Sequence, residues 1–142
     1  MSGIRTLIDF SKRRVDGALT TWQQLRAQCD DAKQKLSLLK QHGEGYHGIM
    51  RTGLQQGMPA GSTVAYLGFI GQIEAIVVRQ ESEVGHLEAA CAQQWQELVD
   101  ARREKRMYEI LSERATARQL ASKSRLRQAE MDELLQRAGK LR

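Results

Sequence analysis

An apolar residue recurs every three or four positions through the first third of this chain, and this rhythm restricts the fold more than any other feature. It continues for six heptads, broken at Ser11 and Gly43. Spacing that averages 3.5 residues holds one stripe of a helix against a partner helix, so it predicts a left-handed coiled coil. The stripe consists of Ile4, Ile8, Val15, Ala18, Trp22, Leu25, Cys29, Ala32, Leu36, Leu39, Tyr46 and Met50.

The rhythm stops near Pro59, the one proline in the chain. Proline removes a backbone donor and clashes with the preceding turn of a helix, whereas Gly57 and Gly61 allow the backbone angles of a reversal. Ser62 or Thr63 then offers a hydroxyl that could cap a second helix. The sequence therefore predicts one reversal at about residues 56–62.

A second apolar stripe follows the reversal. It runs through Tyr66, Ile70, Ile73, Val77, Gln80, Val84, Leu87, Cys91, Gln94, Leu98, Ala101, Lys105, Tyr108 and Ala115. Its polar members lower stability but can restrict register and partner. Because a short loop between two long helices makes them antiparallel neighbours, we predict an all-α fold. It forms one domain over residues 1–142, an antiparallel coiled-coil hairpin with helices at about 3–55 and 63–138.

The second helix is longer than the first. At 1.5 Å per residue the two helices span about 75 Å and 110 Å, so about 25 residues overhang at the C-terminal end. This overhang, residues 114–142, has no intramolecular partner, and its segment Met131–Leu135 is typical of the apolar face of a docking helix. Its apolar residues are Leu120, Leu126, Met131, Leu134, Leu135, Ala138 and Leu141.

The composition excludes several classes of protein. Aromatic residues make up 5% of the chain and charged residues 27%, a mixture that suits long helices with a narrow seam. No stretch approaches the roughly 18 apolar residues that span a bilayer, and no secretion signal is evident. We therefore expect a cytosolic protein without direct membrane insertion. Cys29 and Cys91 should then be reduced and unbridged.

Catalysis is not expected. A two-helix rod offers no concave pocket in which reactive groups can converge. The sequence contains no phosphate-binding loop, nucleophile elbow or metal-ligand spacing, and His42, His47 and His86 are scattered along it. We predict a protein that is not an enzyme and holds no metal or cofactor.

Charge is distributed in three blocks. Residues 1–42 carry eight basic and four acidic side chains, residues 43–101 two and seven, and residues 102–142 twelve and six. The cluster Arg102–Arg106 is interleaved with Glu104, Glu109 and Glu113 at spacings that suit ion pairs along a solvated helix face. An acidic protein partner is a second interpretation of this cluster, and nucleic acid a third.

The two tryptophans also allow two interpretations. Trp22 and Trp95 are expected to cover the seam between the helices. The alternative is that they are exposed anchors for a partner, because tryptophan is enriched at binding hot spots.

Several segments resemble the flagellar export protein FliJ family, and the resemblance covers nearly the whole chain. The most specific are the Tyr66-Leu67-Gly68-Phe69-Ile70 segment and the closing Met131-Asp132-Glu133-Leu134-Leu135-Gln136-Arg137-Ala138. Further matches are Cys29–Leu36, Tyr46, and Trp95 ahead of Arg103-Glu104-Lys105-Arg106.

The resemblance implies a soluble component of the bacterial flagellar type III export apparatus, peripheral at the cytoplasmic face of the inner membrane. Its partners would be the hexameric export ATPase FliI, the export gate protein FlhA and export chaperones. Carried over to this sequence, the gate-binding surface would comprise Leu39, His42, Tyr46, Phe69, Ile73, Ile76 and Gln80.

The ATPase would meet the opposite, basic end of the hairpin. A positively charged end with an overhanging apolar helix suits the central pore of a hexamer. The residues expected to bind the ATPase are Arg13, Arg14, Arg114, Arg118, Met131, Leu134, Leu135 and Arg137.

Two other functions compete with this one. The equivalent stalk of a virulence type III secretion system shares shape and size with the flagellar protein. A basic coiled coil associated with nucleic acid is less favoured, since it would need phosphate contacts and steeply salt-dependent binding.

Overall fold

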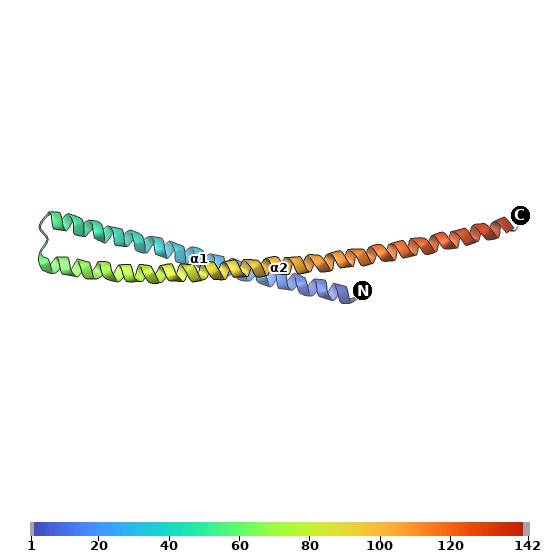
Figure 1. Ribbon diagram of the computed structural model, residues 1–142, viewed down its shortest axis with the longest axis horizontal. Coiled ribbons are helices and arrows are strands. Elements are labelled where there is room, and N and C mark those ends of the chain that lie inside the picture. Colours follow the sequence, from blue (N-terminus) through green and yellow to red (C-terminus); the bar gives the residue numbers. More distant parts are fainter. Residues whose placement is uncertain (1, 141–142) are drawn as a thin grey trace. The chain divides into compact units, whose positions relative to one another are not determined.

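Two long helices make up the protein. The computed structural model describes residues 2–140 and contains α1 (Ser2–Gln55) and α2 (Ala60–Lys140), as Figure 1 shows. No strand occurs within these described residues. The predicted all-α hairpin of unequal helices is therefore confirmed. Leu141 and Arg142, which the predicted overhang includes, lie outside the described residues.

The chain packs as two units. One, called the hairpin unit here, is Gly17–Leu98, and the other, called the end unit, is Met1–Asp16 with Val99–Arg142. The single-domain organisation stays a prediction.

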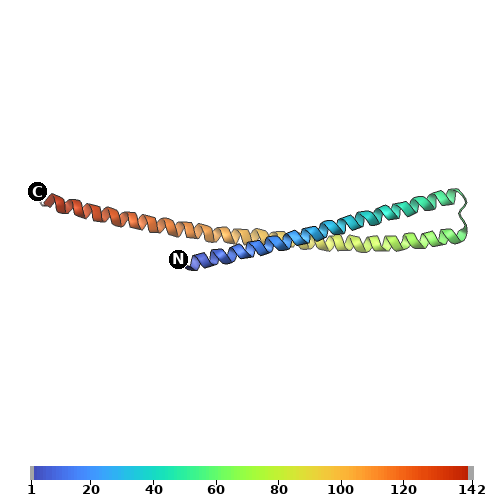
Figure 2. The same ribbon diagram turned by 180° about the vertical axis from the view of Figure 1, so that it is seen from behind.

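In the hairpin unit, the two helices run antiparallel and are joined across the seam. The Gln80 Nε2 donates to the Ala32 carbonyl oxygen at 3.0 Å, and the Gln94 Nε2 donates to the Ala18 carbonyl oxygen at 3.3 Å. Figure 2 shows the antiparallel course of the two helices from behind. The buried apolar residues are Cys29, Ala32, Ile70, Val84 and Leu98, and all belong to the two predicted stripes. The core is thus a single seam.

The reversal is built from a specific end to α1. Gly57 has a φ of +83°, its N–H points to the Leu54 carbonyl oxygen at 3.4 Å, and the Met58 N–H donates to the Gly53 carbonyl oxygen at 2.8 Å. This pair of bonds with a left-handed glycine is a Schellman motif. The Met58 side chain occupies the space that a Cβ at position 53 would need.

The start of α2 differs from the prediction. The helix begins at Ala60, so Ser62 and Thr63 lie inside its first turn and the expected hydroxyl cap is wrong. Instead, the Pro59 carbonyl oxygen accepts the Thr63 N–H at 3.1 Å and the Thr63 hydroxyl at 3.3 Å. Because proline has its φ already set near the helical value, the chain can enter the helix directly after it.

The end unit contains a short paired segment and a long unpaired one. Val15 and Ala101 are buried, and the buried Ser11 donates its hydroxyl to the Ile8 carbonyl oxygen at 2.8 Å. Arg14 forms an ion pair with Glu104. Every residue from 116 to 140 is exposed, so this part of α2 has no partner within the described chain.

The beginning of α2 is unusually poor in charge. Glu74 is the only charged residue between Ala60 and Val78. One 18-residue window of α2 is long and apolar enough to cross a membrane, and only 6% of it is buried. The expectation that no stretch approaches such a composition is therefore wrong. Soluble helices meet the same criteria, so the absence of membrane insertion stays a prediction.

Two candidate partner-binding surfaces

The seven residues predicted to bind the export gate all lie in the hairpin unit, and we call them the tip surface: Leu39, His42, Tyr46, Phe69, Ile73, Ile76 and Gln80. The rings of Tyr46 and Phe69 stack across the two helices, with centroids 5.8 Å apart and planes at 19°. Leu39 and Ile73 line one shallow groove of about 310 Å³. The structure therefore places these four residues, two from each helix, where α1 and α2 face one another.

Exposure separates the members of the tip surface. Phe69 is 55% exposed and Ile76 is 44% exposed, and their seven-residue separation places them on one face of α2. His42 is exposed as well, whereas Leu39, Tyr46 and Ile73 are half-buried in the seam. Phe69, Ile76 and His42 are thus the members that a partner can reach most freely.

Gln80 joins the two helices. It is half-buried, and its side-chain amide donates a hydrogen bond to the Ala32 carbonyl oxygen of the opposite helix. A partner that used this donor would have to replace a bond that already holds the seam together.

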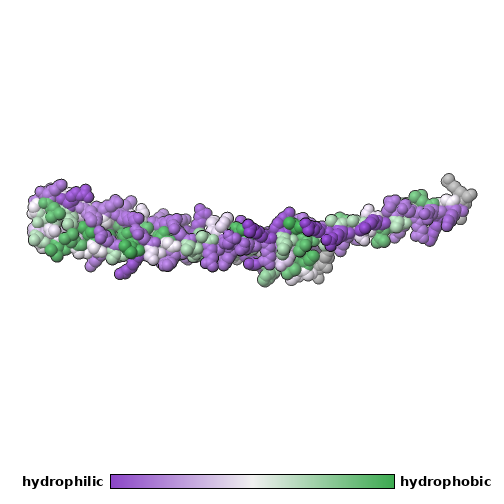
Figure 3. All heavy atoms as spheres, viewed as in Figure 1, coloured by the Kyte–Doolittle hydropathy of each residue, from purple (hydrophilic) through white to green (hydrophobic). Residues whose placement is uncertain are grey.

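Sequence reasoning missed much of the apolar surface around the reversal. Six further large apolar side chains of this region are exposed: Leu38, Ile49, Leu54, Val64, Leu67 and Val78. Figure 3 shows hydrophobic atoms gathered over this part of the hairpin unit. These residues fall outside the two seven-residue stripes, and a search for seam positions alone ignores them. Their position outside the stripes could have indicated an exposed apolar surface. Extended apolar patches on a soluble protein usually mark an interaction site.

The eight residues predicted to bind the ATPase all lie in the end unit, and we call them the end surface: Arg13, Arg14, Arg114, Arg118, Met131, Leu134, Leu135 and Arg137. Met131, Leu134 and Leu135 are all more than half exposed. Arg14 pairs with Glu104, and Arg137 pairs with Glu133 at 2.9 Å. Such exposed ion pairs contribute little, so a partner can exchange them at small cost.

The end surface is spread along α2 and is not compact. Arg14 pairs with Glu104, whereas Met131 follows 27 residues later on the same helix, with Arg114 and Arg118 between them. At 1.5 Å per residue this separation is about 40 Å. One partner can contact the whole surface only if it surrounds or follows α2 over that length.

Two members of the basic cluster, Lys105 and Arg106, form ion pairs within α2, whereas Glu104 pairs with Arg14 of α1. Lys105 pairs with Glu109 at 3.7 Å, and Arg106 pairs with Glu109 at 3.5 Å and with Glu113 at 3.4 Å. These contacts confirm the predicted ion pairs along the helix face.

Cys29 and Cys91 are both free, which confirms the prediction that they are not bridged. Within residues 2–140, no group of three or more His, Cys, Asp or Glu side chains is placed to hold a metal ion.

Comparisons with known proteins point to one family. The family model described as Flagellar FliJ protein matches residues 1–142. The Flagellar FliJ protein of Salmonella typhi is 27% identical over 143 residues, covering 95% of this chain and 92% of that protein. The Flagellar FliJ protein of Escherichia coli (strain K12) is 25% identical over the same shares. No solved structure matches. The chain therefore belongs to the FliJ family, and its role is related to flagellar export.

Proposed function

We propose that this chain is a non-enzymatic stalk of the flagellar type III export apparatus. It joins the hexameric export ATPase FliI to the export gate protein FlhA and receives export chaperones. It is cytoplasmic and reaches the inner membrane through these partners. The observation that carries the proposal is the unpaired stretch of α2, in which residues 116–140 are all exposed and Met131, Leu134 and Leu135 present an apolar face.

The end surface is assigned to the ATPase on grounds of chemistry. A single helix is marginal in water, so an isolated apolar face gains most when a partner covers it. Residues 114–140 also carry seven basic and three acidic side chains. An electropositive helix suits the pore of a hexamer whose lining is acidic.

The ATPase assignment is tested by the hydrolysis rate of the cognate hexamer with and without this protein. The full chain is expected to raise the rate, and deletion of residues 131–142 is expected to abolish the increase. A sharper variant is Met131→Ala with Leu134→Ala and Leu135→Ala, because alanine keeps the helix intact.

The matched control is Leu120→Ala with Leu126→Ala, two leucines that are equally exposed on the same helix. The control should stimulate like the full chain. Equal stimulation by the triple variant would refute the assignment of Met131, Leu134 and Leu135.

The tip surface is assigned to the gate protein. Phe69→Ala with Ile76→Ala should weaken binding to the cytoplasmic part of the gate by about tenfold or more, because buried aromatic anchors dominate interfaces. Leu120→Ala with Leu126→Ala removes similarly exposed apolar groups that belong to neither surface and is the control. Binding is measured by isothermal calorimetry. An unchanged affinity in the Phe69→Ala with Ile76→Ala variant, or an equal loss in the control, would refute the assignment of the tip surface to the gate.

A further inference from the structure

A row of ion pairs runs along one side of the hairpin unit at seven-residue intervals. Lys33 lies 3.3 Å from Glu88, and Lys40 lies 3.7 Å from Glu81. The His47 Nε2 lies 3.5 Å from Glu74, and that pair is charged only when the histidine is protonated. Both helices repeat their charges every heptad, so the next pair of the row would join residues 26 and 95.

That next pair is missing, because α2 has a tryptophan where the row requires an acid. Arg26 occupies the basic position, but its counterpart is Trp95. Its guanidinium lies 5.3 Å from the centre of the Trp22 ring. Among residues 2–140, no carboxylate pairs with Arg26 as Glu88 pairs with Lys33.

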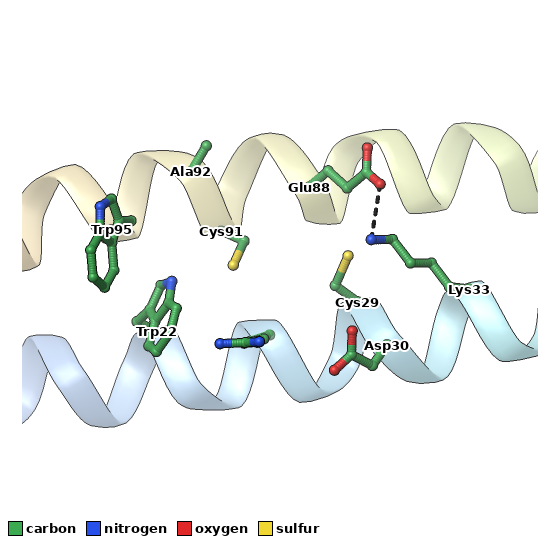
Figure 4. Close-up of a pocket in the computed structure, with 9 residues that line it drawn as sticks. Trp22, Cys29, Asp30, Lys33, Glu88, Cys91, Ala92 and Trp95 are labelled. Carbon is green, nitrogen blue, oxygen red and sulfur yellow. Dashed lines mark ion pairs between the residues drawn. The ribbon is translucent and has the colours of Figure 1, made fainter.

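The interruption of the row coincides with an open groove of about 630 Å³. Trp22 and Trp95 point toward one another at one end of it, with ring centroids 5.0 Å apart, as Figure 4 shows. The Lys33–Glu88 pair closes the other end. Between these ends the side chains are small: Cys29 and Cys91 lie between the helices, and the exposed Ala92 lies at the edge of the groove.

The groove is sized for side chains of a protein. Its two ends are one heptad apart, about 10 Å along the helices, which accommodates the side chains of about two turns of a docked helix. Trp95 is 43% exposed although it lies beside the seam. A half-exposed tryptophan close to an arginine that forms no ion pair has the character of a binding hot spot. Trp95 and Arg26 meet this description.

We propose that this groove docks an amphipathic helix of a partner protein. That helix places one large apolar side chain against Trp22 and Trp95 and one carboxylate beside Arg26, completing the row of ion pairs. The groove shares no residue with the tip surface or the end surface, so this inference does not rest on the proposed function.

Charge selects this occupant over two others. A nucleic acid would stack on the tryptophans, but its chain of phosphates would also meet the carboxylates of Asp30 and Glu88, which line the same groove. The overhang of a second copy carries seven basic and three acidic side chains over residues 114–140, so it offers few carboxylates to Arg26 and would bring further basic groups beside Arg26 and Lys33. A segment with a single well-placed carboxylate fits both the arginine and the two acids.

The test uses the full chain, expressed from its own locus in the cells that make it. Ala92→p-benzoylphenylalanine places a photo-crosslinker at the edge of the groove. Gln93→p-benzoylphenylalanine is the matched control, because Gln93 is exposed like Ala92 but the next residue of a helix points about 100° away. We expect a crosslinked partner at position 92 that is at least about fivefold weaker at position 93.

Charge reversal then tests the chemistry. Arg26→Glu should reduce the crosslink about fivefold or more, and Arg26→Gln should reduce it less. The crosslinked segment should carry a large apolar residue within one turn of Asp or Glu. Changing that acid to Arg should restore the crosslink in the Arg26→Glu chain. Circular dichroism and the emission of the two tryptophans verify that each variant keeps its fold.

Four results would overturn the proposal. The first two are a crosslink that is no stronger at position 92 than at position 93, and a crosslink to a second copy or to nucleic acid. The third is a crosslinking yield that Arg26→Glu leaves unchanged. The fourth is a failure of the acid-to-Arg change in the partner to restore the crosslink of the Arg26→Glu chain.

Discussion

Leu98 offers the sharpest test of the idea that a single seam holds the hairpin together. Its side chain is 0% exposed, and it is the largest fully buried apolar side chain of the described residues. Leu98→Ala removes three carbons, and at about 0.8 kcal/mol for each buried carbon the transfer cost is about 2.4 kcal/mol. A cavity that stays open would increase the cost toward about 5 kcal/mol. Because two helices can close a gap more easily than a thick core, we expect about 2–3 kcal/mol.

The assay is urea-induced unfolding followed by far-ultraviolet circular dichroism, with the slope compared between variants to check that unfolding stays two-state. Leu38→Ala is the matched control, since Leu38 is 56% exposed on α1. The control should change the free energy of unfolding by less than about 0.5 kcal/mol. If the two variants lose the same amount, or if Leu98→Ala loses less than about 1 kcal/mol, the seam is not the source of stability.

Three further predictions concern the turn, the seam and the ion pairs. Gly57→Ala forces a side chain into a left-handed conformation and should lower the free energy of unfolding by about 1–2 kcal/mol. Gly61→Ala lies inside α2 and should raise the free energy of unfolding by about 0.5–1 kcal/mol. Both changes are measured by denaturant unfolding. Gln94→Leu should raise the melting temperature, because it replaces a polar seam residue with an apolar one; a lower melting temperature would mean that its bond to Ala18 matters more than its burial. The hydrogen bond to Glu88 raises the pKa of Lys33 in the folded protein. The stability that this pair contributes is therefore present below the ordinary lysine pKa of about 10.4, and it is lost as the pH rises through the raised pKa of the folded protein. Unfolding curves of the full chain and of Lys33→Gln should therefore differ at neutral pH and converge above that value, and a difference that persisted there would contradict this sign.

Much of the fold could be predicted from the sequence because one physical requirement dominates it. Every buried apolar residue, from Val15 to Ala101, belongs to a stripe that the apolar rhythm predicts. Ser11, which interrupts the first stripe, is buried all the same, since its hydroxyl bonds to the Ile8 carbonyl oxygen. A rhythm of apolar positions therefore identifies the seam even where one member is polar.

Other features depend on alignment between the helices, which the rhythm leaves open. A stripe that repeats every seven residues looks the same after a shift by seven, so it cannot predict that Lys40 meets Glu81. For the same reason, the groove beside Trp95 could not be foreseen from sequence. The start of α2 at Ala60 differs from the expected one because Pro59, instead of a hydroxyl cap, supplies the conformation that begins the helix.

The missing ion pair has a consequence for how the helices find their alignment. If α1 slid along α2 by one heptad, about 10 Å, at least two of the three acid–base contacts could form again with new partners. The Trp22–Trp95 contact could not, because the chain contains no third tryptophan. The ion pairs therefore tolerate a shift of the helix register by one heptad. The Trp22–Trp95 contact does not, so it selects the observed register.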